Sequence, residues 1–204
     1  MISISDLKEQ ISSCKICATD PIGSPLPHDP RPVAVISEQA KIRIIGQAPG
    51  TRVHESGRPF TDPSGDRLRD WMGIDEEDFY NPDKLAITPM GFCFPGLDAK
   101  GGDLPPRKEC AKRWQNAVSD AMPQIELVLL IGMYAQKHYL RERAEKTLTA
   151  TVKNWKAISA ITDGVKSIPL PHPSWRNNAW IKKNPWFSSE LLPFLRGEIQ
   201  ASLQ

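Results

Sequence analysis

Four short apolar segments, separated by stretches of helical periodicity, constrain the fold of this chain most strongly. The predicted strands span 42–45, 85–88, 127–131 and 166–170. The segment 127–131 is the most apolar, so we expect it in the centre of the sheet, where a strand is buried on both faces. Strands that alternate with helices favour a parallel sheet covered on both faces. The sequence therefore predicts an α/β fold.

The segments between the strands carry helix signals. Predicted helices span 5–13, 64–72, 107–121, 134–143 and 185–195. Serine commonly caps helix N-termini, so we expect Ser5 and Ser64 to begin the first two helices. Prolines precede the third helix and Pro123 follows it, as is typical of helix boundaries.

Length and composition indicate a single globular domain. The chain has 204 residues, of which 40% are hydrophobic and 25% charged, which is ordinary for such a domain. We expect one domain over 1–204, with 1–40 forming a helix and a cysteine-bearing segment packed on it. The sequence has no apolar run near the roughly 18 residues of a membrane span. Its amphipathic N-terminus is unlike a signal peptide. The expected setting is the cytoplasm, without membrane contact, and the expected state is a monomer.

Two unlike motifs follow predicted strands. Gly46-Gln47-Ala48-Pro49-Gly50 comes directly after the strand 42–45, and His172-Pro173-Ser174 comes shortly after the strand 166–170. Loops that leave the carboxyl ends of parallel strands meet at one edge of the sheet, where open α/β folds bind ligands. The two motifs are therefore expected to share one site.

The four cysteines form a Cys14-x2-Cys17 pair and two separate residues, Cys93 and Cys110. Disulfides are not expected, because nothing marks the protein as secreted. A zinc ribbon normally uses two close pairs, whereas thiolates from separate loops can surround an iron–sulfur cluster. We expect a structural four-cysteine site that favours a 4Fe-4S cluster over zinc. The alternative is a set of unrelated buried thiols.

Together these motifs resemble family 4 of the uracil-DNA glycosylase superfamily, the iron–sulfur branch. The matching segments, in the family's order, are Cys14 and Cys17, Gly46–Gly50, Gly57-Arg58-Pro59-Phe60, Cys93 and Cys110, and His172–Ser174. The resemblance implies a three-layer α/β/α sandwich around a four-stranded parallel sheet. It also implies hydrolysis of the N-glycosidic bond of a deaminated or damaged base flipped out of DNA.

The chain departs from the family pattern at three places. Gln47 replaces a glutamate of the first motif, and Val53 and His54 replace an acidic pair. Pro89 stands where the family has a pyrimidine-reading asparagine. Proline has neither an amide side chain nor a backbone N–H, so it cannot form the paired hydrogen bonds that reject cytosine. The excised base is therefore left open between uracil and related bases, including hypoxanthine and xanthine.

The resemblance implies a role for each motif residue. Phe60 would stack on the flipped base, and His172 would donate a hydrogen bond to a base oxygen. The residues expected to surround the base and the attacking water are Gln47, Ala48, Pro49 and Gly50. Ala48 occupies the position of a catalytic aspartate in other branches of the superfamily, so His54 or Glu55 is expected to position the water.

The segment 174–184 mixes tryptophans with cations, a composition suited to DNA contact. The expected phosphate-binding residues are Ser174, Arg176, Lys182 and Lys183. A solvated basic loop above two packed tryptophans is the alternative. The net charge of +2 is not typical of a dedicated nucleic-acid binder, but transient contact needs only a local basic face.

Two other functions stay open. A chain that lacks the family's glutamate and asparagine could bind DNA or a damaged base with little excision. Hydrolysis of a free nucleoside or modified nucleotide is the third possibility. Dependence of activity on duplex length distinguishes this last function from DNA repair.

Overall fold

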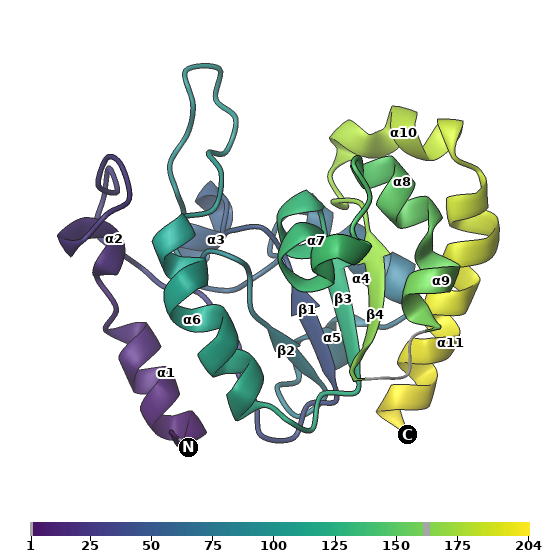
Figure 1. Cartoon of the computed structure of the whole chain (residues 1–204), viewed down its shortest axis with the longest axis horizontal. Coiled ribbons are helices and arrows are strands. Elements are labelled where there is room, and N and C mark those ends of the chain that lie inside the picture. The colour runs from purple at the N-terminus through teal and green to yellow at the C-terminus, as the bar shows by residue number, and fades with distance from the viewer. Residues whose placement is uncertain (1, 161–163) are drawn as a thin grey trace.

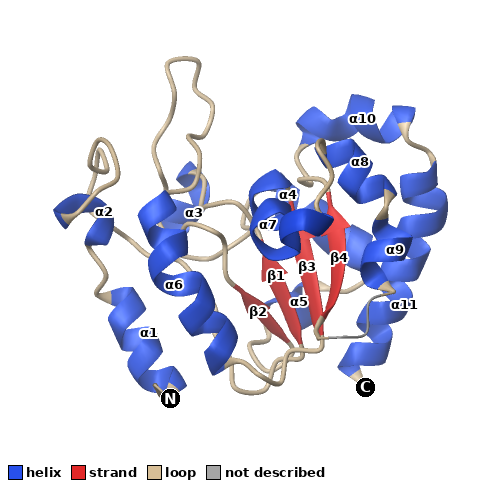
Figure 2. Cartoon of the chain, viewed as in Figure 1, coloured by secondary structure: helices blue, strands red, loops and turns tan. Residues whose placement is uncertain are grey.

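The computed structural model describes residues 2–160 and 164–204 and has a four-stranded parallel sheet at its centre (Figures 1 and 2). The strand order is β2-β1-β3-β4. The strands are β1 (Ile42–Ile45), β2 (Leu85–Ile87), β3 (Leu127–Ile131) and β4 (Lys166–Leu170). The predicted α/β class is confirmed, and the apolar β3 lies inside the sheet as expected. β2 is one residue shorter than predicted.

The strands start in register across the sheet. Ile42 pairs with both Leu85 and Leu127, and Leu127 pairs with Lys166. Because all four strands run in the same direction, the loops that follow them emerge at the same edge, the upper edge in Figure 1. The two sequence motifs therefore lie at one end of the molecule.

Two apolar clusters, one on each face of the sheet, make the structure a three-layer sandwich. Alternate residues of β1 divide between them: Ile45 belongs to one cluster, and Ile42 and Ile44 belong to the other. The first cluster contains buried residues of α1 (Ile4–Ser12), α2 (Ile16–Thr19), α6 (Lys108–Ala121) and α7 (Met133–Leu140). The second contains those of α4 (Pro63–Met72), α5 (Glu76–Tyr80) and α11 (Leu192–Leu203). Helices thus cover both faces, as Figure 2 shows.

Short helices that have no periodicity in the sequence complete the structure. They are α3 (Thr51–Ser56), α8 (Leu148–Lys153), α9 (Trp155–Ser159) and α10 (Asn178–Lys183). Two 3-10 turns cover Arg141–Arg143 and Trp175–Asn177, the second called η2 here. No helix in the described part of the chain is long and apolar enough to cross a membrane.

The predicted caps of the first two long helices are wrong. Ser3, not Ser5, caps α1 by accepting a hydrogen bond from the Asp6 N–H at 3.0 Å. Asp62, not Ser64, caps α4 and is followed by Pro63, which needs no hydrogen-bond acceptor at the first helical position. In both cases an oxygen-bearing residue two positions earlier reaches the free N–H groups.

The predicted C-terminal ends of the helices 134–143 and 185–195 are wrong. α7 stops at Leu140 and continues as the 3-10 turn. A π-helical turn over Phe187–Leu191 precedes α11, which extends to Leu203. Pro193 does not end the helix because it lies in the first turn of α11, where proline is tolerated.

The N-terminal segment packs on the sheet and on α6. Ile4, Leu7 and Ile11 of α1 are buried in the same apolar cluster as residues of α6. Further along, the N–H of Val33 donates to the Phe92 carbonyl at 2.7 Å, and Val35 forms an antiparallel bridge with Ile87. The chain therefore approaches the sheet along the edge formed by β2.

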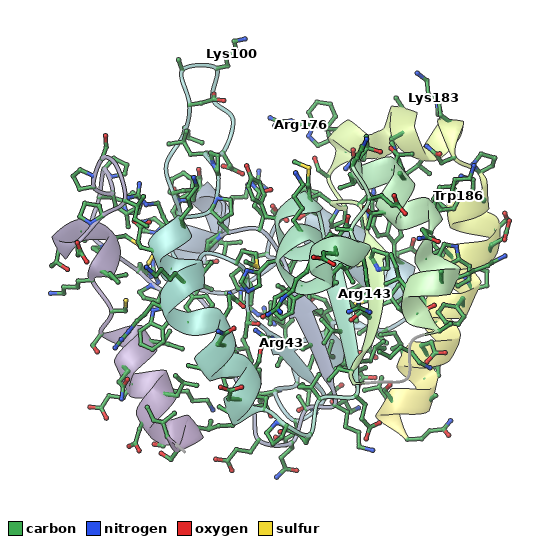
Figure 3. The ribbon with its side chains drawn as sticks, viewed as in Figure 1. Arg43, Lys100, Arg143, Arg176, Lys183 and Trp186 are labelled. Atoms are coloured by element: carbon green, nitrogen blue, oxygen red, sulfur yellow. The ribbon has the colours of Figure 1, made fainter. Side chains whose placement is uncertain are left out.

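Arg43 of β1 is a buried cation, 3% exposed, on the α6 side of the sheet (Figure 3). Its guanidinium donates to Thr88 Oγ1 at 2.6 Å, Ser119 Oγ at 2.8 Å and Gln115 Oε1 at 3.0 Å. Among the described residues it has no acidic partner within salt-bridge distance. Desolvation therefore lowers the pKa of Arg43. Neutral oxygens replace water around the charge.

We predict that Gln115→Leu destabilises the fold. It removes an acceptor from Arg43 and the Nε2 donor that binds the carbonyl of Pro89 at 2.8 Å. Each buried group left without a partner costs about 1–3 kcal/mol, so the free energy of unfolding should fall by at least that amount. Urea unfolding measures the change, with Asn116→Leu on the exposed side of α6 as the control. Equal stability of the two variants would contradict the prediction.

Candidate active site

A pocket opens at the carboxyl edge of the sheet. It is lined by the predicted residues Gln47, Ala48, Pro49, Gly50, Phe60 and His172, and also by Pro89. The structure thus brings together the turn after β1, the loop before α4 and the loop after β4. The lining also contains Val33, Asp62, Ile87 and Asp103, which the sequence did not single out, and Val53 and Ser64, for which it predicted no place in the site.

The glycines of the first motif lie next to two other pocket residues, at distances where a Cβ would make ordinary contact. A Cβ at Gly46 would lie 3.6 Å from the Phe60 ring, and a Cβ at Gly50 would lie 3.5 Å from Oδ2 of Asp103. The carbonyls of Gly46 and Gln47 accept hydrogen bonds from the loop after β2 at 2.9 and 3.0 Å. The turn is therefore held rigidly, and its small residues leave the pocket open.

Phe60 has a φ of 55°, which is uncommon for a bulky residue. The hydroxyl of Tyr80 donates to the carbonyl oxygens of Pro59 and Phe60, both at 3.0 Å. The ring of Phe60 meets that of Phe79 edge to face at 5.9 Å. Such backbone strain persists only where the surroundings enforce it. The Phe60 ring is therefore fixed in the pocket wall before any ligand binds.

Gly65 in the first turn of α4 makes this conformation possible. A Cβ at this position would lie 1.9 Å from the carbonyl oxygen of Phe60, closer than atoms can approach. The main chain at Phe60 therefore packs directly on the backbone of α4. This contact joins the pocket wall to the helix that Asp62 caps.

We predict that Gly65→Ala lowers the free energy of unfolding by about 1–3 kcal/mol, because the added methyl group forces the backbone of Phe60 to move. Chemical denaturation measures the loss. Gly197→Ala is the matched control, since Gly197 is in α11 and a Cβ there meets nothing within 4 Å. The control should be neutral or stabilising, because alanine favours helix more than glycine does. If Gly65→Ala were as stable as the wild type, the close contact between Gly65 and the Phe60 carbonyl would be contradicted.

His172 is held as one neutral tautomer. Its Nδ1 accepts the backbone N–H of Ser174 at 3.2 Å, so the ring proton is on Nε2. Its carbonyl accepts from the side-chain amide of Asn177 at 2.6 Å. Burial lowers the pKa of His172, and the carboxylates of Asp62 and Asp103 oppose this shift. A neutral imidazole with Nε2–H can donate a hydrogen bond to a developing anion without first losing a proton.

The two pocket carboxylates differ in their surroundings. Oδ1 of Asp62 caps α4, accepting from the N–H of Ser64 at 3.1 Å, from that of Gly65 at 3.3 Å and from the Ser64 hydroxyl. Asp103 lies at the rim, on a hairpin between β2 and α6. The sequence Asp62-Pro63 carries a cap signal that could have been recognised. No local pattern marks Asp103.

The family model described as the uracil DNA glycosylase superfamily matches residues 33–196, which is most of the chain. The chain belongs to this superfamily. A solution NMR structure of a candidate uracil DNA glycosylase from Methanosarcina acetivorans is also similar, at 15% identity and a TM-score of 0.48. The match covers 82% of this chain and 95% of that one.

The superfamily match includes Cys93 and Cys110 but begins after Cys14 and Cys17. All four are free thiols that contact one apolar cluster. Burial raises the pKa of Cys17 to about 11 and that of Cys93 to about 12, and neighbouring cysteines add to both shifts. In the part of the chain that the structure describes, however, no three His, Cys, Asp or Glu side chains form a group arranged to hold a metal ion.

Two of the sulfur atoms accept hydrogen bonds. The N–H of Phe92 donates to Sγ of Cys110 at 3.2 Å, and the indole N–H of Trp114 donates to Sγ of Cys14 at 3.4 Å. Burial raises the pKa of Cys110, and the hydrogen bond from the Phe92 N–H opposes this shift. The donor set therefore has the chemistry that an iron–sulfur cluster uses.

His54 and Glu55 lie at the end of α3 and are not part of the pocket lining. The ring of His54 packs against His28 at 4.3 Å and Phe94 at 5.8 Å. The main-chain carbonyls of His54 and Glu55 both accept from Arg31 at 2.7 Å. The water-positioning role of His54 and Glu55 stays a prediction. Their carbonyl oxygens hold Arg31, which lies in the segment before β1.

The predicted DNA-binding residues lie beside the pocket, on η2 and α10. Ser174 caps η2 by accepting the Arg176 N–H at 3.2 Å, and Arg176, Lys182 and Lys183 are exposed. Figure 3 shows Arg176 and Lys183 at the same end of the molecule as Lys100. Trp175 is 70% exposed, whereas Trp180 packs inward and donates to Thr149 Oγ1 at 2.7 Å. The exposed Trp175 ring and the cations suit DNA contact. The inward packing of Trp180 fits the alternative of a solvated basic loop above packed tryptophans.

Proposed function

We propose that this protein is a DNA glycosylase that hydrolyses the N-glycosidic bond of a deaminated or damaged base flipped out of DNA. The observation that carries the proposal is the pocket in which Phe60, neutral His172 and two carboxylates face the same space. This combination lies at the carboxyl edge of the sheet in a chain of the uracil DNA glycosylase superfamily.

The residues match the charge changes of the reaction. Breaking the glycosidic bond leaves negative charge on the departing base and positive charge on the sugar. The Nε2–H of His172 would stabilise the base oxygen, and the carboxylates of Asp62 and Asp103 would stabilise the sugar. The Phe60 ring would stack on the flipped base and hold it in the pocket, an interaction worth about 1–3 kcal/mol per base.

The base excised is proposed to be uracil or a related base. Pro89 lines the pocket without a side-chain amide, and its carbonyl is already bound by Gln115. Recognition of the base edge must then rely on main-chain groups of Gln47 to Gly50 and on His172. The lining has few side-chain donors that would select one base by its edge, so hypoxanthine and xanthine belong in the same test as uracil.

The protein would bind DNA as a monomer. Arg176, Lys182 and Lys183 would contact phosphates on one side of the pocket, with Ser174 at its edge. Phosphate contacts through lysine and arginine position the duplex and make binding sensitive to salt.

We also propose that Cys14, Cys17, Cys93 and Cys110 bind a 4Fe-4S cluster, with zinc as the less favoured metal. A cluster bound there would join the segment after α1 to the loop after β2 and to α6, the three parts that carry the cysteines. Its role would be structural, since none of the four cysteines lines the pocket.

The direct test is single-turnover cleavage of oligonucleotides that contain uracil, hypoxanthine, xanthine or hydroxymethyluracil. His172→Ala should slow base release by at least about 100-fold, because it removes a donor to the developing anion. His138→Ala is the control, since His138 lies on α7 and outside the pocket. DNA binding without release of any base from the wild-type protein would favour the alternative, a damaged-base-binding protein.

The cluster proposal has its own measurement. Protein purified without oxygen should contain about four iron and four sulfide ions per chain. Cys110→Ala should lose this iron and lower the melting temperature, because the metal stabilises the folded state. Zinc in place of iron would identify the alternative metal. Loss of catalysis with unchanged melting would contradict the structural role.

A further inference from the structure

A hairpin over residues 96–104 rises from the carboxyl edge of the sheet between β2 and α6 (Figure 1). Leu97 and Asp103 form an antiparallel bridge, and the N–H of Leu104 donates to the Gly96 carbonyl at 2.9 Å. Oδ1 of Asp98 accepts the N–H groups of Lys100 and Gly102 at 2.8 and 2.9 Å. These bonds order the hairpin, so Asp103 at its base has a defined position.

Asp103 reaches the pocket from this hairpin. Its carboxylate lies against Gly50, where a Cβ would be 3.5 Å from Oδ2, and it lines the same pocket as His172. Within residues 2–160 and 164–204, no hydrogen bond or ion pair engages the Asp103 side chain. Asp62, by contrast, uses Oδ1 to cap α4. Of the two pocket carboxylates, Asp103 is the one with neither oxygen hydrogen-bonded among the described residues, whereas Asp62 has only Oδ2 left for a ligand.

The titratable groups near Asp103 come from three other elements. They are Asp62 before α4, His172 after β4, and Arg176 on η2. Partial burial raises the pKa of Asp103, Arg176 lowers it, His172 lowers it only when protonated, and Asp62 raises it. Bound DNA would cover the rim and exclude further water. A carboxylate in this setting is a stronger base than one in free solution.

We propose that Asp103 is the carboxylate that activates the attacking water in this pocket, a role that rests on the proposed glycosylase function. The position fits because the carboxylate is carried on an ordered hairpin, lies beside Gly50 of the turn after β1, and lines the same pocket as Phe60 and His172. His54 and Glu55 do not line the pocket and are less well placed for this step.

The step balances as follows. The C1′–N bond breaks, and its electron pair leaves with the base, which accepts the hydrogen bond from His172. The water oxygen forms the new bond to C1′, and one water proton passes to the Asp103 carboxylate. That proton returns through solvent to the departed base anion. The products are the neutral free base and an abasic sugar that carries the new hydroxyl group, and no oxidant or metal is consumed.

The test is single-turnover cleavage with the full-length protein and the lesion that it cleaves fastest. Asp103→Asn should slow cleavage by at least about 100-fold, the size of effect typical of a general base. Asp103→Glu should retain more activity than Asp103→Asn. Asp98→Asn removes the same charge from the same hairpin, keeps an acceptor oxygen and lies outside the pocket, so it should keep the wild-type rate.

Two further readouts separate a catalytic role from a structural one. Asp103→Asn should bind the lesion duplex as tightly as the wild type or more tightly, because a negative charge is removed from a surface that faces phosphates. The wild-type rate should rise with pH as Asp103 ionises, above the usual range for aspartate, and this rise should be absent in Asp103→Asn. Asp62, His172 and Arg176 are unchanged in the comparison.

The outcomes distinguish the two proposals. If the wild type releases a base and Asp103→Asn releases it at the same rate, or loses rate only in step with DNA binding, the role of Asp103 is overturned and the glycosylase proposal stands. If the wild type releases no base from any of the four lesions, both proposals are overturned together.

Discussion

The buried guanidinium of Arg43 connects the core of this protein to its pocket. A cation inside an apolar layer is tolerated only when its N–H groups find acceptors. Here the acceptors are Thr88 after β2, and Gln115 and Ser119 on α6. Because Gln115 also binds the carbonyl of Pro89, satisfying the charge fixes the turn that forms part of the pocket. The packing of α6 on the sheet and the shape of the site therefore depend on the same hydrogen bonds of Gln115.

Close backbone contacts fix the rest of the pocket. Gly65 lets the carbonyl of Phe60 lie directly on α4, and Gly46 and Gly50 lie next to the Phe60 ring and Asp103. A site arranged in this way can act on charge as it develops, because its groups need little rearrangement during the reaction. The hairpin over 96–104 and the η2–α10 segment stand on the outer side of this rigid frame, where a long polymer can reach them.

The sequence predicted the strands well and the short helices poorly, for physical reasons. Apolar runs such as β3 can be predicted as buried strands because all their side chains are hydrophobic. Helices such as α3 and α10, at six residues each, contain fewer than two turns and show no periodicity. The cap at Ser3 differs from the prediction because Ser3 and Ser5 both carry a hydroxyl, and only the backbone geometry selects the one that reaches the free N–H groups, whereas Pro63 marks Asp62 as the cap of α4.

The sequence alone determined the parallel α/β sheet, the two motif loops at its carboxyl edge and the resemblance that led to the superfamily. These features follow from local composition and from motifs whose order along the chain can be read directly. Only the tertiary structure decided that Asp62 and Asp103 share the pocket with His172, that His54 and Glu55 lie outside its lining, and that the four cysteines contact one apolar cluster. Such contacts depend on strand register and on how long loops close, and neither is encoded in the local pattern of residues.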